Sequence, residues 1–543
     1  MPLSGLIYQR RADLGHIILP FEPHASCWDP FFCSALQAQP FLQDSLFQVF
    51  NASLESAVTR RQDLPSSKLV FAHLVMGIVG NRGSAADYDD DMRRAKDLGI
   101  DAFALNIAQD VPPAQLEFAY ESANNNGMKV FISFDGNFYA PGDEQAIGAN
   151  ISTYASRPAQ LRVGTSPGRV FVSTFNGDLN PNGPLNVQTI RNAAGLDIYF
   201  APNFHPGVGD FSLLDGALNW QSWQSDGNNR APSGGNLVTV AQGDQAYLAS
   251  LGGKGYIAGV SPWFSTHFGA EVPFSKNWVF PSDLLLYRRW IDILALQPTF
   301  LEIATWNDYG ESHYIGPLSA KHTDDGASKW ANDMPHLGWS ELSRPFIAAY
   351  KAGSTSVNSF IQNEKLIYWY RITSKNLNCD ATDTTIGGNG DFDHGRPNGF
   401  DTMLDNVFVV ALLTSPGTVT VNSGGTLYTF DAPAGASAIQ VPFNVGAQRF
   451  ALSRNNAEVM SETSLKVIQD TCPCGLYNFN AYVGTVPDSG ERDVLSGDSL
   501  AAFENGLKVD DCAPTASLPT SPPATAAPTT TVSVSAVPTS PPV

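Results

Sequence analysis

The segment 306–313, Trp-Asn-Asp-Tyr-Gly-Glu-Ser-His, carries the densest group of side chains that could do chemistry. Its two carboxyl groups, Asp308 and Glu311, flank a turn that contains Gly310. Residues three apart in a strand face opposite sides, so both carboxyls can face one site only beyond a strand end. There, one could protonate a leaving oxygen while the other activates a water molecule, which is the chemistry of glycosidic bond hydrolysis. The alternative is a surface turn that caps a helix, but that would not need the flanking Trp, Asn, Tyr and His.

A third carboxyl group, Asp135, directly follows the apolar run 131–134 and is also a catalytic candidate. Its alternative role is that of a turn or helix-capping aspartate beside Gly136. Aromatic and polar side chains follow the other apolar runs, where rings could stack on sugars and polar groups could bind hydroxyls. The alternative is that these histidines and tryptophans are core residues. The candidate substrate-binding residues are His73, Asn106, Trp220, Trp223, Trp263, His267, Trp306, Asn307, Tyr309 and His313.

Composition limits what the chain can bind. It has 32 Lys and Arg against 52 Asp and Glu, a formal net charge of −20, which argues against nucleic acid and suits an uncharged substrate. No cluster of Arg or Lys follows the apolar runs, so we expect no phosphate ligand. No His-x-His or Glu-x-x-His pair occurs at these positions, so we expect neither a catalytic metal nor a cofactor.

The candidate residues share a place in a repeating pattern, in which each lies within or just after a short apolar run and helical stretches separate the runs. Continuous apolar runs predict parallel strands that are buried on both faces. Eight strand–helix units predict a (β/α)8 barrel, whose active site lies at the carboxyl ends of its strands. A doubly wound sheet is the alternative, but no Gly-rich phosphate loop follows the first run. The eight runs are 69–79, 101–107, 129–134, 169–175, 197–204, 216–223, 255–264 and 299–306.

Three of the intervening helices have recognisable features. The stretch 88–98 ends at Gly99, and 112–126 begins with prolines and ends at Gly127, as is typical of helix termini. The stretch 282–296 carries large apolar residues at helical spacing, which predicts a helix with one buried face.

The pattern changes after Gly353, where short β-branched and aromatic runs alternate with Ser-, Pro- and Gly-containing turns. This pattern predicts a β-sandwich. Its strands are expected at 366–373, 407–413, 418–421, 426–430, 439–443 and 450–453. We therefore divide the chain into a leader or irregular segment at 1–65, a catalytic barrel at 66–352, a sandwich at 353–512 and a disordered Ser/Thr/Pro-rich linker or stalk at 513–543.

Cysteine content favours the secretory route. An even number of cysteines is typical of disulfide-bonded extracellular proteins, and the four in the C-terminal region could form two bridges. No apolar run is long enough to predict a membrane span. The stretch 1–25 is not a convincing signal peptide, and the pair Arg60-Arg61 is either a processing site or a solvated linker pair. We expect a secreted or cell-wall monomer. The cysteines are Cys27, Cys33, Cys379, Cys472, Cys474 and Cys512.

Several segments together resemble glycoside hydrolase family 71, the fungal α-1,3-glucanases or mutanases. The resemblance covers about residues 68–510, and its longest part is 305–316, Thr-Trp-Asn-Asp-Tyr-Gly-Glu-Ser-His-Tyr-Ile-Gly. The other segments that carry it are 72–73, 101–106, 131–135, 172–175, 261–264, 366–371 and 477–482.

The resemblance implies a (β/α)8 barrel with an accessory β-sandwich. It also implies endo-hydrolysis of α-1,3-glucosidic bonds in fungal wall glucan or bacterial mutan, with inversion at the anomeric carbon. The essential carboxylates of the family map onto Asp135, Asp308 and Glu311. We expect Glu311 to be the acid, Asp308 to be the base and Asp135 to orient the sugar or the water. Inversion requires an acid and a base about 6.5–9.5 Å apart, with room for a water molecule.

Two other functions stay open on sequence grounds. One is a wall protein that binds glucan but no longer turns it over, against which the three intact carboxyl groups argue. The other is a barrel glycosidase that acts on a different linkage.

Overall fold

The structure of the protein is a computed structural model that describes residues 68–227, 229–269, 276–383, 395–494, 522–528 and 530–533. These residues all belong to one compact unit. The expected leader, Arg60-Arg61, Cys27, Cys33 and Cys512 lie outside the described residues.

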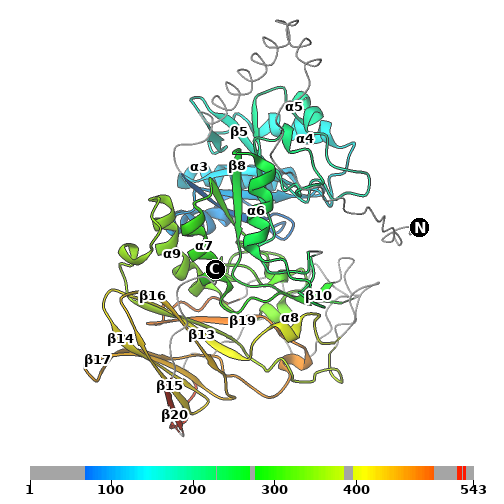
Figure 1. The fold of residues 1–543 in the computed structure, drawn as a ribbon. Helices are drawn as coiled ribbons and strands as arrows, with labels where there is room; N and C mark the ends of the chain where they lie inside the picture. Colours follow the sequence, from blue (N-terminus) through cyan, green and yellow to red (C-terminus); the bar gives the residue numbers. More distant parts are fainter. Residues whose placement is uncertain are drawn as a thin grey trace, which may run out of the picture. The chain divides into compact units, whose positions relative to one another are not determined.

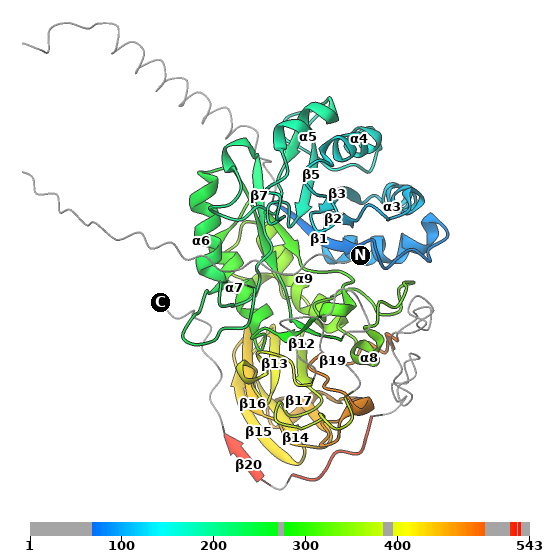
Figure 2. The same ribbon diagram turned by 90° about the vertical axis from the view of Figure 1, so that its right-hand side faces the viewer.

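A curled, mostly parallel sheet forms the N-terminal part of the described chain (Figures 1 and 2). A parallel strand lies within each of the eight apolar runs, which confirms the predicted strands. Their order is β6-β5-β3-β2-β1-β11-β8-β7, and the short β4 (Arg162–Val163) pairs antiparallel with β5. The parallel strands are β1 (Leu69–Val75), β2 (Ala102–Ile107), β3 (Lys129–Asp135), β5 (Arg169–Phe175), β6 (Ile198–Phe200), β7 (Gly216–Asn219), β8 (Gly255–Val260) and β11 (Phe300–Ile303).

Aromatic packing and backbone hydrogen bonds hold the curl. Phe71 lies against Phe131 and Phe171, with ring centroids 5.0 and 5.2 Å apart, inside a cluster contributed by strands all along the sheet. Beyond the strand ends, the Asp215 N–H donates to Phe200 O at 3.0 Å, which links the segments of β6 and β7 at the two ends of the strand order. Strands that are buried on both faces explain why their sequences are continuously apolar.

Helices cover the outer face of this sheet, and Figure 2 shows α3 to α6 around it. Two predicted helix ends are confirmed, because Gly99 and Gly127 follow α2 and α3 with φ of 100° and 66°. The helix expected at 282–296 begins at Leu285. The helices are α2 (Asp89–Leu98), α3 (Pro113–Asn126), α4 (Glu144–Tyr154), α5 (Val187–Ala194), α6 (Val240–Leu251), α7 (Leu285–Leu296), α8 (Ser328–Ala331) and α9 (Leu337–Lys351), with short 3-10 turns η1 (Ala85–Tyr88), η2 (Phe211–Leu213), η3 (Tyr309–Glu311), η4 (Asn358–Phe360), η5 (Phe400–Thr402) and η6 (Pro473–Gly475).

Two further sheets occupy the C-terminal region, and a small hairpin of β9 (Ser265–Phe268) and β10 (Lys276–Val279) follows β8. The sheets share a buried cluster in which the rings of Tyr368 and Phe450 stack 3.9 Å apart. One has the order β16-β13-β12-β19 and the other β18-β17-β14-β15-β20. Their strands are β12 (Lys365–Arg371), β13 (Asn406–Leu413), β14 (Gly417–Ser423), β15 (Thr426–Ala432), β16 (Gly435–Pro442), β17 (Gln448–Arg454), β18 (Ala457–Thr463), β19 (Ala481–Val486) and β20 (Thr530–Ser533).

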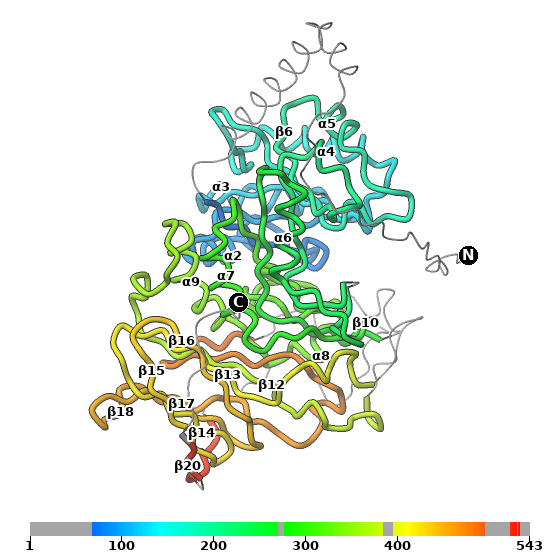
Figure 3. Tube along the Cα trace, viewed as in Figure 1, coloured from blue at the N-terminus to red at the C-terminus, as the bar shows by residue number. Residues whose placement is uncertain are grey.

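The tail differs from its expected disorder within the described residues. Thr530–Ser533 forms β20, which pairs in parallel with β15 (Figures 1 and 3). The Asn422 amide donates to Ala526 O at 3.2 Å, so an upstream part of the tail also contacts this sheet. The edge strand β15 has unpaired backbone groups, and the tail forms hydrogen bonds with them. This pairing depends on the neighbouring strand and could not be predicted from the Ser/Thr/Pro-rich composition of the tail.

One of the expected disulfides joins Cys379 to Cys472, with an S–S distance of 2.06 Å, and Cys474 is also disulfide-bonded. No helix in the described ranges is long and apolar enough to cross a membrane. The curled sheet and the C-terminal sheets are in contact, because the Trp263 indole N–H donates to Phe479 O at 3.0 Å and Trp339 of α9 packs against Trp369 of β12.

Candidate active site

The turn that carries the two central carboxyls lies directly after β11, at the carboxyl end of the sheet. Asp308 is the N-cap of η3, and its Oδ1 accepts a hydrogen bond from the Glu311 N–H at 3.0 Å. Thr305 Oγ1 accepts from the Asp308 N–H at 2.9 Å. Asp308 therefore does cap a short helix, as the alternative interpretation of the sequence supposed, and this cap fixes the two carboxyl groups relative to each other.

Asn307 holds the turn to the first strand of the sheet. Its side-chain Oδ1 accepts from the Val75 N–H at 2.8 Å, and its Nδ2 donates to Val75 O at 3.1 Å. The amide thus continues the hydrogen-bonding pattern of β1 beyond the last paired residue. The structure therefore gives Asn307 a positioning contact with the backbone.

Replacing Asn307 by alanine is expected to lower the free energy of unfolding by about 2–4 kcal/mol, because the buried backbone groups of Val75 lose both partners. Urea unfolding followed by circular dichroism measures this loss. Asn192→Ala serves as the control, since Asn192 is exposed on α5 and an exposed substitution changes stability by about 0.5 kcal/mol or less. Equal stability of the two variants would contradict the assigned contact.

Glu311 lies between two partners that can carry positive charge. Lys276 Nζ from β10 contacts its Oε1, and His313 Nε2 contacts its Oε2 at 2.8 Å. Burial favours the neutral acid, but the charge of Lys276 and the hydrogen bond from His313 outweigh it and hold the pKa of Glu311 well below its usual range. Glu311 is therefore a carboxylate at neutral pH.

Asp308 has the opposite electrostatic environment. Burial, followed by repulsion from the Glu311 carboxylate, raises the pKa of Asp308 above its ordinary value, although Lys276 and His313 oppose the shift. Two neighbouring carboxyls whose pKa values move apart are the arrangement that assigns one to acid and one to base chemistry.

His313 is oriented by Thr305, whose Oγ1 lies 3.1 Å from its Nδ1. If the Thr305 hydroxyl donates to Nδ1, the ring proton lies on Nε2 and points at Glu311, which fits the observed contact. The ring is enclosed by Trp223 and Phe264, with centroids 5.6 and 5.8 Å away. Aromatic packing therefore fixes the plane of the histidine that contacts Glu311.

Asp135 ends β3 at the same edge of the sheet, and its Oδ1 accepts from the Asn137 N–H at 2.9 Å. Burial raises its pKa, while the nearby His73 and Asn106 oppose the shift. The ring of His73, which lies near Asp135, is also in contact with the ring of Trp220, 4.7 Å away between centroids.

A row of side chains connects Asp135 to the turn. Trp220 lies 6.4 Å from His313, ring centre to ring centre, and His313 contacts Glu311. Of the four tryptophans predicted from sequence, Trp220 alone retains partial exposure, which a ring needs in order to stack on a sugar. The structure thus brings together Asp135, His73, Asn106, Trp220, Trp223, Asn307, Asp308, Glu311 and His313.

Four predicted residues have other neighbours. Trp306 donates its indole N–H to Asp91 at 2.8 Å, and Tyr309 donates its hydroxyl to Pro317 O at 2.7 Å. Trp263 contacts Phe479, as described above. His267 lies between Asn277 and Asp383, 2.7 and 2.9 Å away. The residues of this group are buried, with Trp263, His267, Trp306 and Tyr309 between 0% and 3% exposed.

Glu302 is a residue that the sequence analysis missed. It points inward from β11, is 1% exposed, and its Oε1 lies 2.8 Å from His73 Nδ1. A buried carboxyl beside one nitrogen of an imidazole fixes which way the other nitrogen points. The available signal was a single acidic residue inside the apolar run 300–304.

Lys276 and Asp325 were also missed, because their relation to the turn depends on folding. A Cβ placed on Gly310 would lie 2.8 Å from Asp325 Oδ2, so glycine lets this carboxyl approach the turn. Burial, followed by the charges of Asp324 and Asp308, raises the pKa of Asp325 to about 8. In the sequence, Asp324-Asp325-Gly326 has the composition of an ordinary turn.

Another imidazole–carboxyl pair lies beyond β5 and β6, where His205 Nδ1 contacts Asp178 Oδ1 at 2.7 Å. Nearby, the Asn176 amide donates to the Oδ1 of Asn137, two residues after Asp135, at 2.8 Å. These contacts extend a polar edge from β3 to β6.

The side chains of Asp308, Glu311 and His313 offer potential metal-ligand atoms within 4.8 Å of one another. Lys276 Nζ already contacts Glu311 there and supplies positive charge at the carboxylate. The positive charge at Glu311 therefore comes from the protein's own ammonium group.

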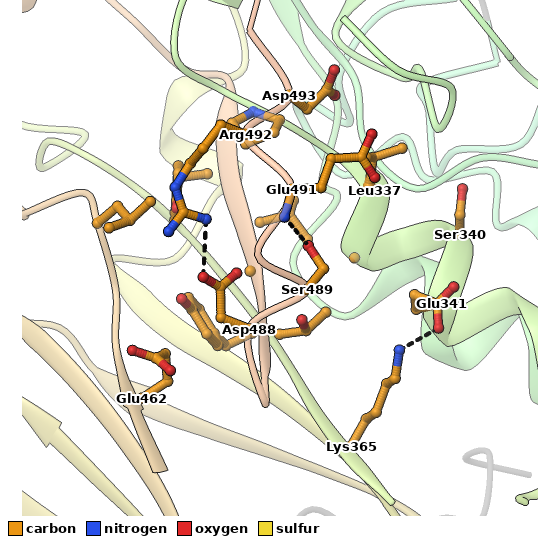
Figure 4. Close-up of a pocket in the computed structure, with 18 of the residues that line it drawn as sticks. Leu337, Ser340, Glu341, Lys365, Glu462, Asp488, Ser489, Glu491, Arg492 and Asp493 are labelled. Carbon is orange, nitrogen blue, oxygen red and sulfur yellow. Dashed lines mark hydrogen bonds and ion pairs between the residues drawn. The ribbon is translucent and has the colours of Figure 1, made fainter. Parts of the chain in front are cut away.

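A separate pocket of about 290 Å³ lies between α9 and the C-terminal sheets (Figure 4). Its charged side chains pair with each other, as in the contacts Lys365–Glu341 and Arg492–Asp488, the latter at 2.9 Å. Asp135, Asp308 and Glu311 are not among the residues that line it. The carboxyl chemistry therefore belongs to the strand ends and not to this pocket.

Paired carboxyl groups beside aromatic and amide side chains, at the carboxyl ends of parallel strands, are the kinds of group with which glycoside hydrolases act. The sequence profile of glycosyl hydrolase family 71 matches residues 66–495, and the chain belongs to this family. This result confirms the resemblance found in the sequence.

Named relatives agree with this membership. A mutanase of Penicillium rubens is 41% identical over 425 residues, covering 77% of this chain and 88% of the relative. A glucan endo-1,3-alpha-glucosidase of Schizosaccharomyces pombe is 33% identical, covering 78% of this chain and 95% of the relative. An ascus wall endo-1,3-alpha-glucanase of the same yeast is 28% identical, covering 70% and 87%.

Proposed function

We propose that this chain is an endo-acting glucanase that hydrolyses α-1,3-glucosidic bonds with inversion. The observation that carries the chemistry is the pair Asp308 and Glu311, whose pKa values are shifted in opposite directions. The linkage is supported by the relatives, which are named for hydrolysis of α-1,3-glucan and cover most of this chain. The substrate is then an uncharged polysaccharide, which suits the net charge of −20.

The electrostatics favour a division of labour opposite to the one expected from the sequence. Asp308, whose pKa is raised, is proposed as the acid that protonates the oxygen of the leaving sugar. Glu311, held as a carboxylate by Lys276, is proposed as the base that takes a proton from water. That water attacks the anomeric carbon from the opposite face while the glycosidic bond breaks. Oxygen atoms of Asp308 and Glu311 lie within 4.8 Å of each other, closer than the spacing of about 6.5–9.5 Å that inversion requires, so this step needs the two carboxyl groups to move apart when the sugar and the water enter. Because Asp308 Oδ1 already accepts from the Glu311 N–H, the transferable proton is assigned to Oδ2.

The remaining predicted residues take different proposed roles. Asp135, with His73 and Asn106 beside it, orients the sugar, and Trp220 stacks on it. Asn307 and His313 hold the turn. The buried residues pack behind the side chains of the proposed site and hold them in place. They are Trp223, Trp263, His267, Trp306 and Tyr309.

The finer architecture is proposed from the same contacts. We assign residues 66–352 to a closed (β/α)8 barrel, because backbone hydrogen bonds join β7 to the segment after β6, which are the two ends of the strand order. One of these bonds runs from the Leu218 N–H to Pro202 O at 2.9 Å. Residues 353–512 form a β-sandwich, supported by their shared core, and 513–543 form a linker. The Cys379–Cys472 bridge supports secretion, and we propose an extracellular monomer.

Lys276→Met is expected to move the acidic limb of the kcat/KM profile upward by about one pH unit or more. Lys276 lowers the pKa of Glu311, so its removal raises that pKa, and the base becomes protonated at a higher pH. Lys276→Arg should restore most of the profile. Lys365→Met, which removes a lysine paired with Glu341, is the control and should leave the limb in place. An unmoved limb in Lys276→Met would rule out Glu311 as the titrating base.

A substrate panel with anomeric NMR tests the function itself. The protein is expected to release oligosaccharides from α-1,3-glucan, with the β-anomer formed first, and not from α-1,4- or β-1,3-glucan. Binding to α-1,3-glucan without release of sugar would favour the wall-binding alternative. Release from another glucan would overturn the assigned linkage.

A further inference from the structure

The strand that carries Lys276 is held from both sides. On one side β10 pairs antiparallel with β9, with Asn277 opposite His267. On the other side the Asn398 N–H donates to Asn277 O at 3.1 Å, and the Val279 N–H donates to Asn398 O at 2.9 Å. Asn398 belongs to the C-terminal region, so β10 lies between its hairpin partner and a segment that begins about 120 residues later.

Side chains make a second connection to the same region. Asn277 Nδ2 donates to Gly395 O at 3.0 Å, which turns Asn277 Oδ1 toward His267 Nδ1, 2.7 Å away. The other ring nitrogen, His267 Nε2, lies 2.9 Å from Asp383 Oδ2. Both ring nitrogens of His267 therefore have a side-chain hydrogen-bonding partner.

This contact is almost completely removed from water. The side chains of His267 and Asp383 are 3% and 2% exposed. Loss of one partner of a buried hydrogen-bonded pair is costly, because the remaining polar group is left unsatisfied away from water. The position of Asn277, the residue after Lys276, is therefore tied to Asp383.

Asp383 is itself anchored by a covalent bond nearby. Its N–H donates to Cys379 O at 2.9 Å, and the Thr382 N–H donates to the same oxygen at 3.0 Å. Cys379 is bonded to Cys472, 93 residues later in the chain. The disulfide thus holds the turn that presents Asp383 to the hairpin.

We propose that Asp383 is a positioning residue of the active site, acting through His267 and Asn277 to keep the Lys276 ammonium on Glu311. The C-terminal region then completes the catalytic site of the parallel sheet. Asp383 contacts no substrate in this scheme. The inference rests on the proposed function, because it takes Glu311 as a group used in hydrolysis.

The test uses the full chain and a double-mutant cycle. Asp383→Asn is isosteric, removes the charge and replaces one acceptor oxygen by an NH2 donor. It is expected to lower kcat on α-1,3-glucan about ten-fold with KM changed less than about two-fold, since misplacement of a catalytic group costs rate and not binding. In a Lys276→Met background, assayed where that variant is active, the additional loss is expected to vanish. Asp380→Asn is the matched control, because Asp380 is exposed on the same turn and accepts from the Tyr477 hydroxyl at 2.8 Å.

Two results would overturn the inference: no loss of kcat in Asp383→Asn, or an equal loss with and without Lys276. Thermal unfolding shows whether each variant is folded, and if Asp383→Asn is not, Asn277→Ala breaks the same connection one step nearer Lys276 and enters the same cycle. These results can be distinguished from failure of the proposed function, in which the unmodified protein would release no sugar from α-1,3-glucan.

Discussion

Glu311→Gln is expected to lower kcat on α-1,3-glucan roughly 10³-fold, within the range that general acid–base catalysis contributes. An amide cannot accept the proton of the attacking water. It also cannot hold the Lys276 ammonium as a carboxylate does. The fold should persist, because the turn is held by Asn307 and by the cap of Asp308, which Gln at position 311 leaves intact. A reducing-sugar assay on purified protein measures the loss.

The control for this variant is Glu458→Gln on β18. Glu458 is likewise paired with a cation, Arg449, at 2.8 Å, but it lies in the C-terminal sheets and away from the turn. It should keep near-native activity. If Glu311→Gln and the unmodified protein release sugar at the same rate, hydrolysis does not depend on this carboxyl.

Asp308→Asn is expected to lower kcat on α-1,3-glucan by about 10³-fold as well, but to spare an activated substrate. The asparagine cannot protonate the leaving oxygen. A fluoride ion leaves without a proton, so an α-1,3-linked glucooligosaccharyl α-fluoride should be hydrolysed within about ten-fold of the native rate. The two substrates are compared at saturating concentration.

The fluoride also separates the roles of the two carboxyls. Glu311→Gln should be slow on both substrates, because attack by water still requires a base. If instead Glu311→Gln were spared on the fluoride and Asp308→Asn were not, the assignment with Glu311 as acid would be correct. Native-like near-UV circular dichroism of both variants ensures that the comparison concerns chemistry.

The parallel strands were predictable because a strand that is buried on both faces requires a continuous run of apolar residues. The strand β18 was not, since its seven residues, Ala-Glu-Val-Met-Ser-Glu-Thr, are largely exposed at a sheet edge and carry no apolar run. β20 was missed for a related reason: its strand character comes from pairing with β15 and not from its own composition.

The carboxyl groups of the site were predictable from residue type and spacing, but their electrical environment was not. Lys276 contacts Glu311 across 35 residues of chain, and Glu302 contacts His73 across 229. Neither contact has a local pattern, because each joins elements that meet only in the folded protein. The expectation that Glu311 is the acid and Asp308 the base came with the family resemblance and took no account of Lys276.

The bonds between Asn307 and Val75 join positions 232 residues apart. Val75 is synthesised early, whereas Asn307 follows the eighth parallel strand in the chain. The catalytic turn can therefore bind to β1 only after nearly the whole sheet has been synthesised. A nascent chain that stops short of that point carries no assembled pair of carboxyls. Catalytic competence thus arrives late in biosynthesis.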